Sequence, residues 1–201
     1  MAINFQYNKT SLQKLEKDLK VRERALPTIK SKESALRVEV KRAKDEVKRL
    51  DLQLEQSMQS YDSMVALWGE FDTSLIRVQD VRMSVKKIAG VMTPVLEGVD
   101  FEIASFSLFN TPLWFLDGME LIKELAKVGI EREFYARKMH LLEYARKKTT
   151  QKVNLFEKVQ VPGYADAIRK IKRFMEDEEN LSKSAQKIVK SRQQNIEEEA
   201  L

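Results

Sequence analysis

A heptad pattern near the N-terminus constrains the fold of this chain more than any other feature. Steps of alternately three and four residues from Leu12 to Leu75 meet apolar side chains at all but three positions. This spacing is that of a coiled-coil seam, and it predicts one helix of about nine heptads, roughly 100 Å long. The seam residues are Leu12, Leu15, Leu19, Arg22, Leu26, Ile29, Glu33, Leu36, Val40, Ala43, Val47, Leu50, Leu54, Ser57, Tyr61, Met64, Trp68, Phe71 and Leu75.

Residues that start or interrupt helices are scarce, with only 6 Gly and 4 Pro in the 201 residues. Thr10 or Ser11 is a plausible N-cap for the first helix. Pro27 predicts a local bend, because a proline removes one backbone donor inside a helix. The seam continues into Trp68 and Phe71, which we interpret as core residues near the end of this helix.

A short region in the middle of the chain interrupts the helical pattern. Gly90, Pro94, Gly98 and Pro112 lie among β-branched and aromatic residues. Two short strands are predicted there, over residues 85–91 and 100–108, and together they suggest a small β-hairpin.

A second helical stretch follows Pro112 and reaches about Ile196. Its apolar positions are regular in two runs whose register differs, and Pro162-Gly163 predicts a kink or a brief break between them. Two long helices within one chain pair antiparallel when a short region separates them. The fold class is therefore mainly α, a long antiparallel two-helix coiled-coil hairpin with a small β-hairpin subdomain at the bend. The predicted segments are 1–75 (first helix), 76–112 (bend region) and 113–201 (second helix, kinked near Pro162).

Charge is distributed unevenly along the chain, which carries a net charge of +5. Residues 1–50 hold 14 basic and 7 acidic side chains, residues 51–112 hold 4 and 9, and residues 131–173 hold 12 and 5. A chain that folds back near its middle would then have basic termini and an acidic bend.

Residues suited to catalysis or metal binding are nearly absent from the sequence. It contains no Cys and one His, His140, which stands among charged residues and is interpreted as exposed. No P-loop, dinucleotide fingerprint or nucleophile elbow occurs. The acidic runs 176–179 and 197–199 are interpreted as solvated helix faces, because neighbouring side chains on a helix diverge. We therefore predict no catalytic residue, no cofactor and no metal, and a protein that is not itself an enzyme.

Basic stretches such as 146–148 could contact phosphates, but acidic residues are interspersed and no aromatic platform accompanies them. We expect no nucleic acid and favour an acidic protein surface as the partner. No apolar run approaches the roughly 20 residues that span a bilayer, and the N-terminus lacks the apolar core of a signal peptide. No membrane insertion is expected, and a cytoplasmic location is the default.

A motif in the second helix matches a known family. Residues 147–157, followed by Val161-Pro162, resemble the Thr-rich, Val-Asn-Ala-Leu-Glu and Ile-Pro pattern of the D subunit of the V-type and A-type rotary ATPases, the central rotor shaft. Asn154, Glu157 and Pro162 occupy the family positions. Gln151-Lys152 replaces an arginine pair and Leu155-Phe156 replaces Ala-Leu.

Two weaker matches extend the resemblance. Asn8-Lys9-Thr10 stands where the family has Asn-Pro-Thr, and the segment after it follows the family spacing. Lys87, Ile88, Gly90 and Pro94 resemble the segment that opens the family's β-hairpin. Residues that the resemblance assigns to an interface with the catalytic hexamer are Asn8, Thr10, Lys30, Lys32, Lys152, Asn154, Glu157 and Pro162.

The resemblance implies a non-catalytic shaft that couples ATP hydrolysis or synthesis to rotation of a membrane ring and to proton or sodium transport. Its implied partners are the catalytic and non-catalytic subunits A and B, the F subunit of the central stalk and the socket subunit of the membrane rotor. Such a shaft would be peripheral on the cytoplasmic side of a membrane. The alternative from composition alone is a cytoplasmic coiled-coil scaffold or tether that binds membrane or nucleic acid through its basic face.

Overall fold

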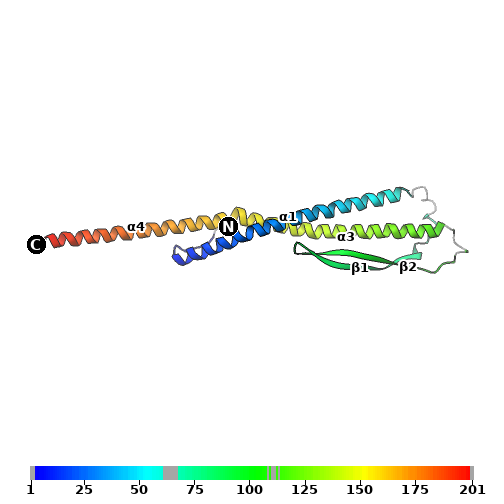
Figure 1. The fold of residues 1–201 in the computed structure, drawn as a ribbon, viewed down its shortest axis with the longest axis horizontal. Helices are drawn as coiled ribbons and strands as arrows, with labels where there is room; N and C mark the ends of the chain where they lie inside the picture. Colours follow the sequence, from blue (N-terminus) through cyan, green and yellow to red (C-terminus); the bar gives the residue numbers. More distant parts are fainter. Residues whose placement is uncertain (1–2, 61–67, 108, 110–111, 113, 200–201) are drawn as a thin grey trace. The chain divides into compact units, whose positions relative to one another are not determined.

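Two long helical segments flank a two-stranded β-hairpin in the computed structural model, which confirms the predicted fold class (Figure 1). The structure describes residues 3–60, 68–107, 109, 112 and 114–199. In chain order the elements are the helix α1 (Lys9–Ser60), the 3-10 turn η2 (Thr73–Leu75), the strands β1 (Ile76–Ile88) and β2 (Val91–Ile103), the helix α3 (Trp114–Asn154), the π-helical turn η3 (Leu155–Gln160) and the helix α4 (Val161–Glu199).

Helix α1 begins earlier than predicted. The Oδ1 atom of Asn8 accepts a hydrogen bond of 2.7 Å from the backbone N–H of Ser11, so Asn8 is the N-cap. The proposed caps Thr10 and Ser11 are wrong, because an asparagine two residues upstream satisfies a free N–H of the first turn. Pro27 lies inside α1 without ending it.

The predicted seam on α1 is confirmed over the described part of the helix. Every seam position from Leu12 to Ser57 is buried or half-buried. Two polar seam residues, Arg22 and Glu33, are half-buried and find partners, as Arg22 contacts Asp18 and Arg37 binds Glu33 at 3.0 Å.

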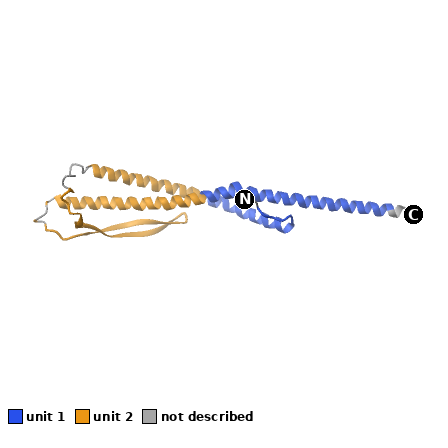
Figure 2. Ribbon diagram, turned by 180° about the vertical axis from the view of Figure 1, so that it is seen from behind, with its two compact units in different colours: residues 1–31, 150–201 blue, residues 32–149 orange. Residues whose placement is uncertain are grey.

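Contacts divide the chain into two compact units, coloured separately in Figure 2. Unit 1 consists of residues 1–31 and 150–201, and unit 2 consists of residues 32–149. The predicted segments follow chain order, whereas unit 1 combines the two ends of the sequence and unit 2 is the continuous stretch between them.

Unit 1 contains antiparallel helices. Glu16 of α1 pairs with Lys172 of α4 at 2.9 Å, and Lys30 pairs with Glu157 of η3 at 2.6 Å, so the partner number falls as the α1 number rises. Its core joins Leu15 of α1 to one face of α4. The buried members are Leu15, Ala167, Ile168 and Ile171, and the half-buried members are Ile3, Phe5, Leu12, Leu19, Tyr164 and Met175.

Unit 2 repeats the antiparallel arrangement with the rest of α1 and with α3. Asp51 binds Arg132 at 2.8 Å, and Leu36, Leu50 and Leu142 are almost completely buried. A second core lies where η2 meets the start of α3. It contains Phe71, Leu75, Phe115 and Met119, with Trp68, Ile76, Phe106, Trp114 and Ile122 packed against them.

The predicted end of the first helix at Leu75 is wrong. The described part of α1 reaches Ser60, and the predicted seam positions Tyr61 and Met64 lie outside the described residues. Phe71 precedes η2 and Leu75 ends it, and both are buried in the second core. Phe71 and Leu75 continue the heptad spacing of α1 in the sequence. In the structure they pack at the base of the hairpin instead of on a helix. The interpretation of Trp68 and Phe71 as core residues is confirmed.

The β-hairpin is confirmed, but the predicted strand bounds are wrong. Residues 89 and 90 form the turn, with φ of 48° at Ala89 and 85° at Gly90. Positive φ at both central residues is the geometry of a tight hairpin turn, so the strand predicted over residues 85–91 ends at this turn. Gly98 and Pro94 do not interrupt β2, because an irregularity in pairing lies next to Gly98 and a two-stranded sheet has free edges.

Candidate functional site

A π-helical turn marks unit 1. In η3 the backbone hydrogen bonds span five residues, as the Val161 N–H donates to the Phe156 carbonyl. Pro162 follows directly and has no N–H, and in a regular α-helix its ring would meet the Lys158 carbonyl. The wider π turn avoids this clash. The irregularity predicted at Pro162-Gly163 is therefore a π turn just before these residues, and no described residue between α3 and α4 leaves the helical backbone.

The π turn shifts the phase of the buried face by one residue. Steps of three and four run through half-buried or buried positions from Leu142 to Gln160, and an unbroken heptad would continue at 163, 167, 170 and 174. Positions 163 and 167 are still half-buried or buried, but 170 and 174 are exposed, and the buried and half-buried line passes to Tyr164, Ile168, Ile171 and Met175. One extra residue per π turn accounts for this shift and for the register difference between the two runs in the sequence.

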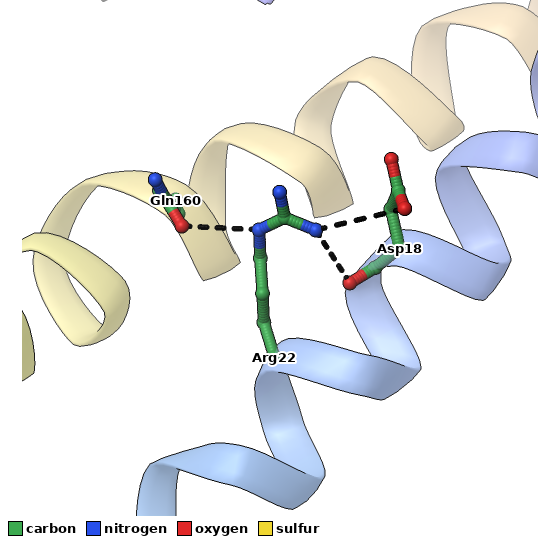
Figure 3. A network of polar contacts seen from close by, with 3 residues as sticks. All are labelled: Asp18, Arg22 and Gln160. Carbon is green, nitrogen blue, oxygen red and sulfur yellow. Dashed lines mark hydrogen bonds and ion pairs between the residues drawn. The ribbon is translucent and has the colours of Figure 1, made fainter. Parts of the chain in front are cut away.

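A polar layer joins α1 to the end of this turn (Figure 3). The Nε atom of Arg22 donates to the Oε1 atom of Gln160 at 3.0 Å, and an Nη atom donates to the Asp18 carbonyl at 2.8 Å. The Asp18 carboxylate lies 3.8 Å from the same guanidinium, whose carbon sits 4.3 Å from the centre of the Tyr164 ring. Four groups from two helices thus converge on one half-buried arginine.

Two of the predicted interface residues meet about two turns from Arg22 along α1. Lys30 Nζ lies 2.6 Å from Glu157 Oε1, and both side chains remain nearly half exposed. Exposed ion pairs of this kind add little to stability, typically about 0.2–1 kcal/mol. The pair links α1 to η3 and leaves both charges accessible.

The other predicted interface residues of unit 1 lie near the start of α1 or next to η3. Thr10 and Pro162 are exposed, and Asn154 ends α3 with its side chain exposed. The Lys152 ammonium lies 5.8 Å from the centre of the Phe156 ring. Asn8 serves as the N-cap of α1.

A groove of about 760 Å³ opens between the N-terminal segment and this part of unit 1. Phe5, Lys14 and Asp18 line it from one side, and Gln160 and Tyr164 line it from the other. Asn8 and Thr10 also reach it. It brings residues of the predicted interface together with the polar layer.

Beyond this region, helix α4 has no packing partner among the described residues. All residues from 176 to 195 are exposed, including Leu181, Ile188 and Val189. Leu181, Ala185 and Ile188 continue a heptad spacing that no described residue covers.

In unit 2, the predicted hairpin residues surround the β turn. Ile88 ends β1, Pro94 pairs with Val85, and Lys87 pairs with Met92. The Lys32 Nζ atom lies 3.0 Å from the point that a Cβ atom would take at Gly90, so the two predicted sets of residues meet here. Any other residue at Gly90 would be strained by the positive φ of this position, and its Cβ atom would crowd the Lys32 ammonium.

The polar layer is what sequence reasoning missed. Arg22 interrupts the apolar seam, and that interruption was the available signal, but nothing in the sequence paired it with Gln160 and Tyr164 across 138 residues or more.

The described residues contain no cluster of three His, Cys, Asp or Glu side chains that could hold a metal ion. His140 is exposed. None of the helices in the described ranges combines the length and apolar character needed to cross a bilayer.

Similarity to known proteins identifies the family. Residues 11–191 match the family model described as the D subunit of ATP synthase. The D subunit of the V-type ATP synthase of Borreliella burgdorferi is 30% identical over 186 residues, which cover 91% of this chain and 92% of the relative. Proteins of the same name from Chlamydia pneumoniae and Chlamydia abortus are 27% and 28% identical and cover 88% and 87% of this chain and 87% and 86% of the relatives. Together with the two-helix fold and its β-hairpin, these matches show that the chain belongs to the family of ATP synthase D subunits.

Proposed function

We propose that this chain is the central stalk subunit of a V-type rotary ATPase and couples ATP hydrolysis or synthesis in a catalytic hexamer to rotation of a membrane ring that moves protons or sodium. The family supports a stalk subunit of such a complex. In this role the chain catalyses nothing itself. It works as a shaft whose sides differ, and one shaft can bias identical catalytic sites only through contacts that differ between the states of those sites.

The observation that carries the proposal is the uncovered end of α4 in a helix that otherwise packs along α1. Residues 176–195 are exposed and Leu181 is 72% exposed, although their heptad spacing is that of a packed seam. A bearing formed by the catalytic and non-catalytic subunits A and B would supply the missing partner. Asn8, Thr10, Lys30, Lys32, Lys152, Asn154, Glu157 and Pro162 are proposed to contact the same subunits.

Unit 2 is proposed to hold the other partners, the F subunit and the socket subunit of the membrane rotor. It exposes large apolar side chains, including Leu52, Met58 and Phe109, and a partner subunit could cover them. Lys87, Ile88, Gly90 and Pro94 shape the hairpin of this unit. Membership in the complex would place the chain at the cytoplasmic side of the membrane.

A truncation tests the coupling role. Ending the chain after Glu176 removes residues 177–195, which are all exposed, and the segment after them, and it retains the unit 1 core, which reaches Met175. We expect the truncated chain to bind the F subunit as before, while ATP hydrolysis in the assembled complex no longer drives ion transport.

The matched control is a full-length chain in which Leu181, Ala185 and Ile188 are replaced by glutamine. It keeps the length of α4 and removes the exposed apolar residues at heptad spacing. Loss of F binding with normal coupling would overturn the assignment of the two ends.

A further inference from the structure

The outer face of the hairpin tip carries three exposed apolar side chains, while Pro94 and Leu96 on the same face are half-buried. Side chains alternate across a strand, and the pairs Met83–Leu96, Val85–Pro94 and Lys87–Met92 therefore share one face. Met83, Val85 and Met92 are 65%, 66% and 62% exposed. We name this set of six residues the hairpin outer face.

The opposite face of the same tip is packed except at Lys86, which pairs with Thr93 and is exposed. Thr93 is fully buried, and its hydroxyl donates to the Lys86 carbonyl at 2.9 Å. Ser84 and Val95, which pair on that face, are half-buried. The hairpin therefore has a defined inside and outside, and exposure of the apolar residues is not a property of a loose ribbon.

We propose that the hairpin outer face docks an amphipathic helix with an acidic flank from another subunit of the ATPase. The proposal rests on the stalk function proposed above. Clustered exposed apolar side chains mark interaction sites, and methionines adapt to the partner surface.

The shape of the surface favours a helix over an added strand. Neighbouring side chains on one face of a strand are about 6.6 Å apart, and residues four apart on a helix are separated by a rise of about 6 Å. A row of side chains on a helix can therefore fit against the row on the hairpin outer face. An added strand would need a regular edge. Gln79 and Glu97 have no opposite residue in the register, and Pro94 has no N–H, so the edges are irregular.

Charge at the tip favours an acidic flank. Lys87 lies on the hairpin outer face, Lys86 is its exposed neighbour, and Lys32 reaches the turn at Gly90. Among the residues that the structure describes, no carboxylate pairs with Lys86 or Lys87. Carboxylates along one side of the docked helix would be attracted to this end of the surface.

The surface has only six residues, fewer than the roughly 20–30 that each partner contributes to a stable interface between separate proteins. Docking is therefore expected only within the assembled complex, where the shaft is already held and the local concentration is high.

Methionine oxidation by peroxide provides the test, because Met83 and Met92 belong to the surface. The purified full-length chain and the purified ATPase complex that contains it are oxidised in parallel, and the rate at each Met is read by mass spectrometry. We expect oxidation of Met83 and Met92 to slow several-fold in the complex, while buried Met119 stays slow in both samples.

Two charge reversals complete the experiment. Lys87→Glu should restore fast oxidation of Met83 and Met92 in the complex, whereas Lys44→Glu on exposed α1 should not. Equal oxidation in the free chain and the complex would overturn the docking surface alone. Protection that survives Lys87→Glu would overturn the acidic flank. Failure of the chain to join the complex would contradict the stalk function and this proposal with it.

Discussion

Arg22 shows how a single residue can set the pairing of two helices. It is the one seam position in unit 1 that carries a charge, and its side chain is only 23% exposed. A polar residue at a seam position favours the register in which its partner lies opposite, and here Gln160 is that partner.

We expect substitutions of Arg22 and of Gln160 to change the free energy of unfolding by different amounts. Gln160→Ala leaves a half-buried N–H without its acceptor and should lower the local free energy of unfolding by about 1 kcal/mol. Arg22→Met removes the charge and keeps apolar volume, so it should cost less or stabilise the unit. Both tryptophans lie in unit 2, so amide hydrogen exchange over residues 155–175 is the suitable measurement.

Gln151→Ala, at an exposed position at the end of α3, is the matched control. Equal effects of Gln151→Ala and Gln160→Ala on exchange would contradict a role for the polar layer.

Asp72 predicts a pH dependence at the base of the hairpin. Hydrogen bonds from Ser74, including a backbone N–H at 2.9 Å, hold the pKa of Asp72 below its ordinary value of 3.8. A depressed folded pKa means that the stabilisation is present above about 3.8 and is lost as the pH falls through the folded pKa. Carbon-detected NMR titration should find this carboxyl titrating below 3.8.

Ser74→Ala keeps the backbone donor and removes the hydroxyl, so it should move the pKa of Asp72 part of the way back toward 3.8. A pKa of Asp72 at or above 3.8 in the unaltered chain would contradict the cap.

At the scale of elements, the π turn is a local insertion that the rest of the helix accommodates. Its extra residue keeps the buried line of α4 facing α1 although the sequence spacing changes. Pro162 fits at the start of α4 because the preceding hydrogen bonds are already displaced.

The π turn predicts opposite results for deletion and insertion. Deleting Val159 together with Pro162→Ala should restore unbroken three and four spacing from Leu142 onward, so the thermal midpoint by circular dichroism should stay equal or rise. Inserting one alanine after Gln160 should rotate Tyr164, Ile168 and Ile171 about 100° out of the core and lower the midpoint. If the deletion lowers the thermal midpoint as much as the insertion does, the π turn itself contributes to packing, which would contradict its interpretation as a local insertion.

The elements also show what the sequence could predict. The α1 seam from Leu12 to Ser57 was predictable because each apolar residue meets a partner helix at a regular spacing. That Phe71 and Leu75 lie outside the helix was not predictable, since they continue the spacing but pack at the hairpin base.

The hairpin turn shows a different limit. Gly90 was noted as an interruption, yet Ala89 also adopts positive φ, and alanine gives no local signal for that conformation. The link from Lys30 to Glu157 joins two residues that the family resemblance had marked, but their pairing depends on the phase of the π turn and was not predictable from either helix alone.

At the scale of the whole molecule, the proposed role is a stalk subunit that transmits force between partners. A scaffold that self-associates is the main alternative, and light scattering separates the two. A stalk subunit should be a monomer in solution, whereas a parallel homodimer would contradict intramolecular pairing of α1 with α3 and α4.

Rotation itself is the most direct measurement. The chain has no native cysteine, so Glu102→Cys on exposed β2 gives one attachment point for a bead while the catalytic hexamer is fixed to a surface. We predict that ATP drives continuous rotation of the bead in one direction. ATP hydrolysis by the same complexes with a stationary bead would contradict the proposed role as a rotating shaft.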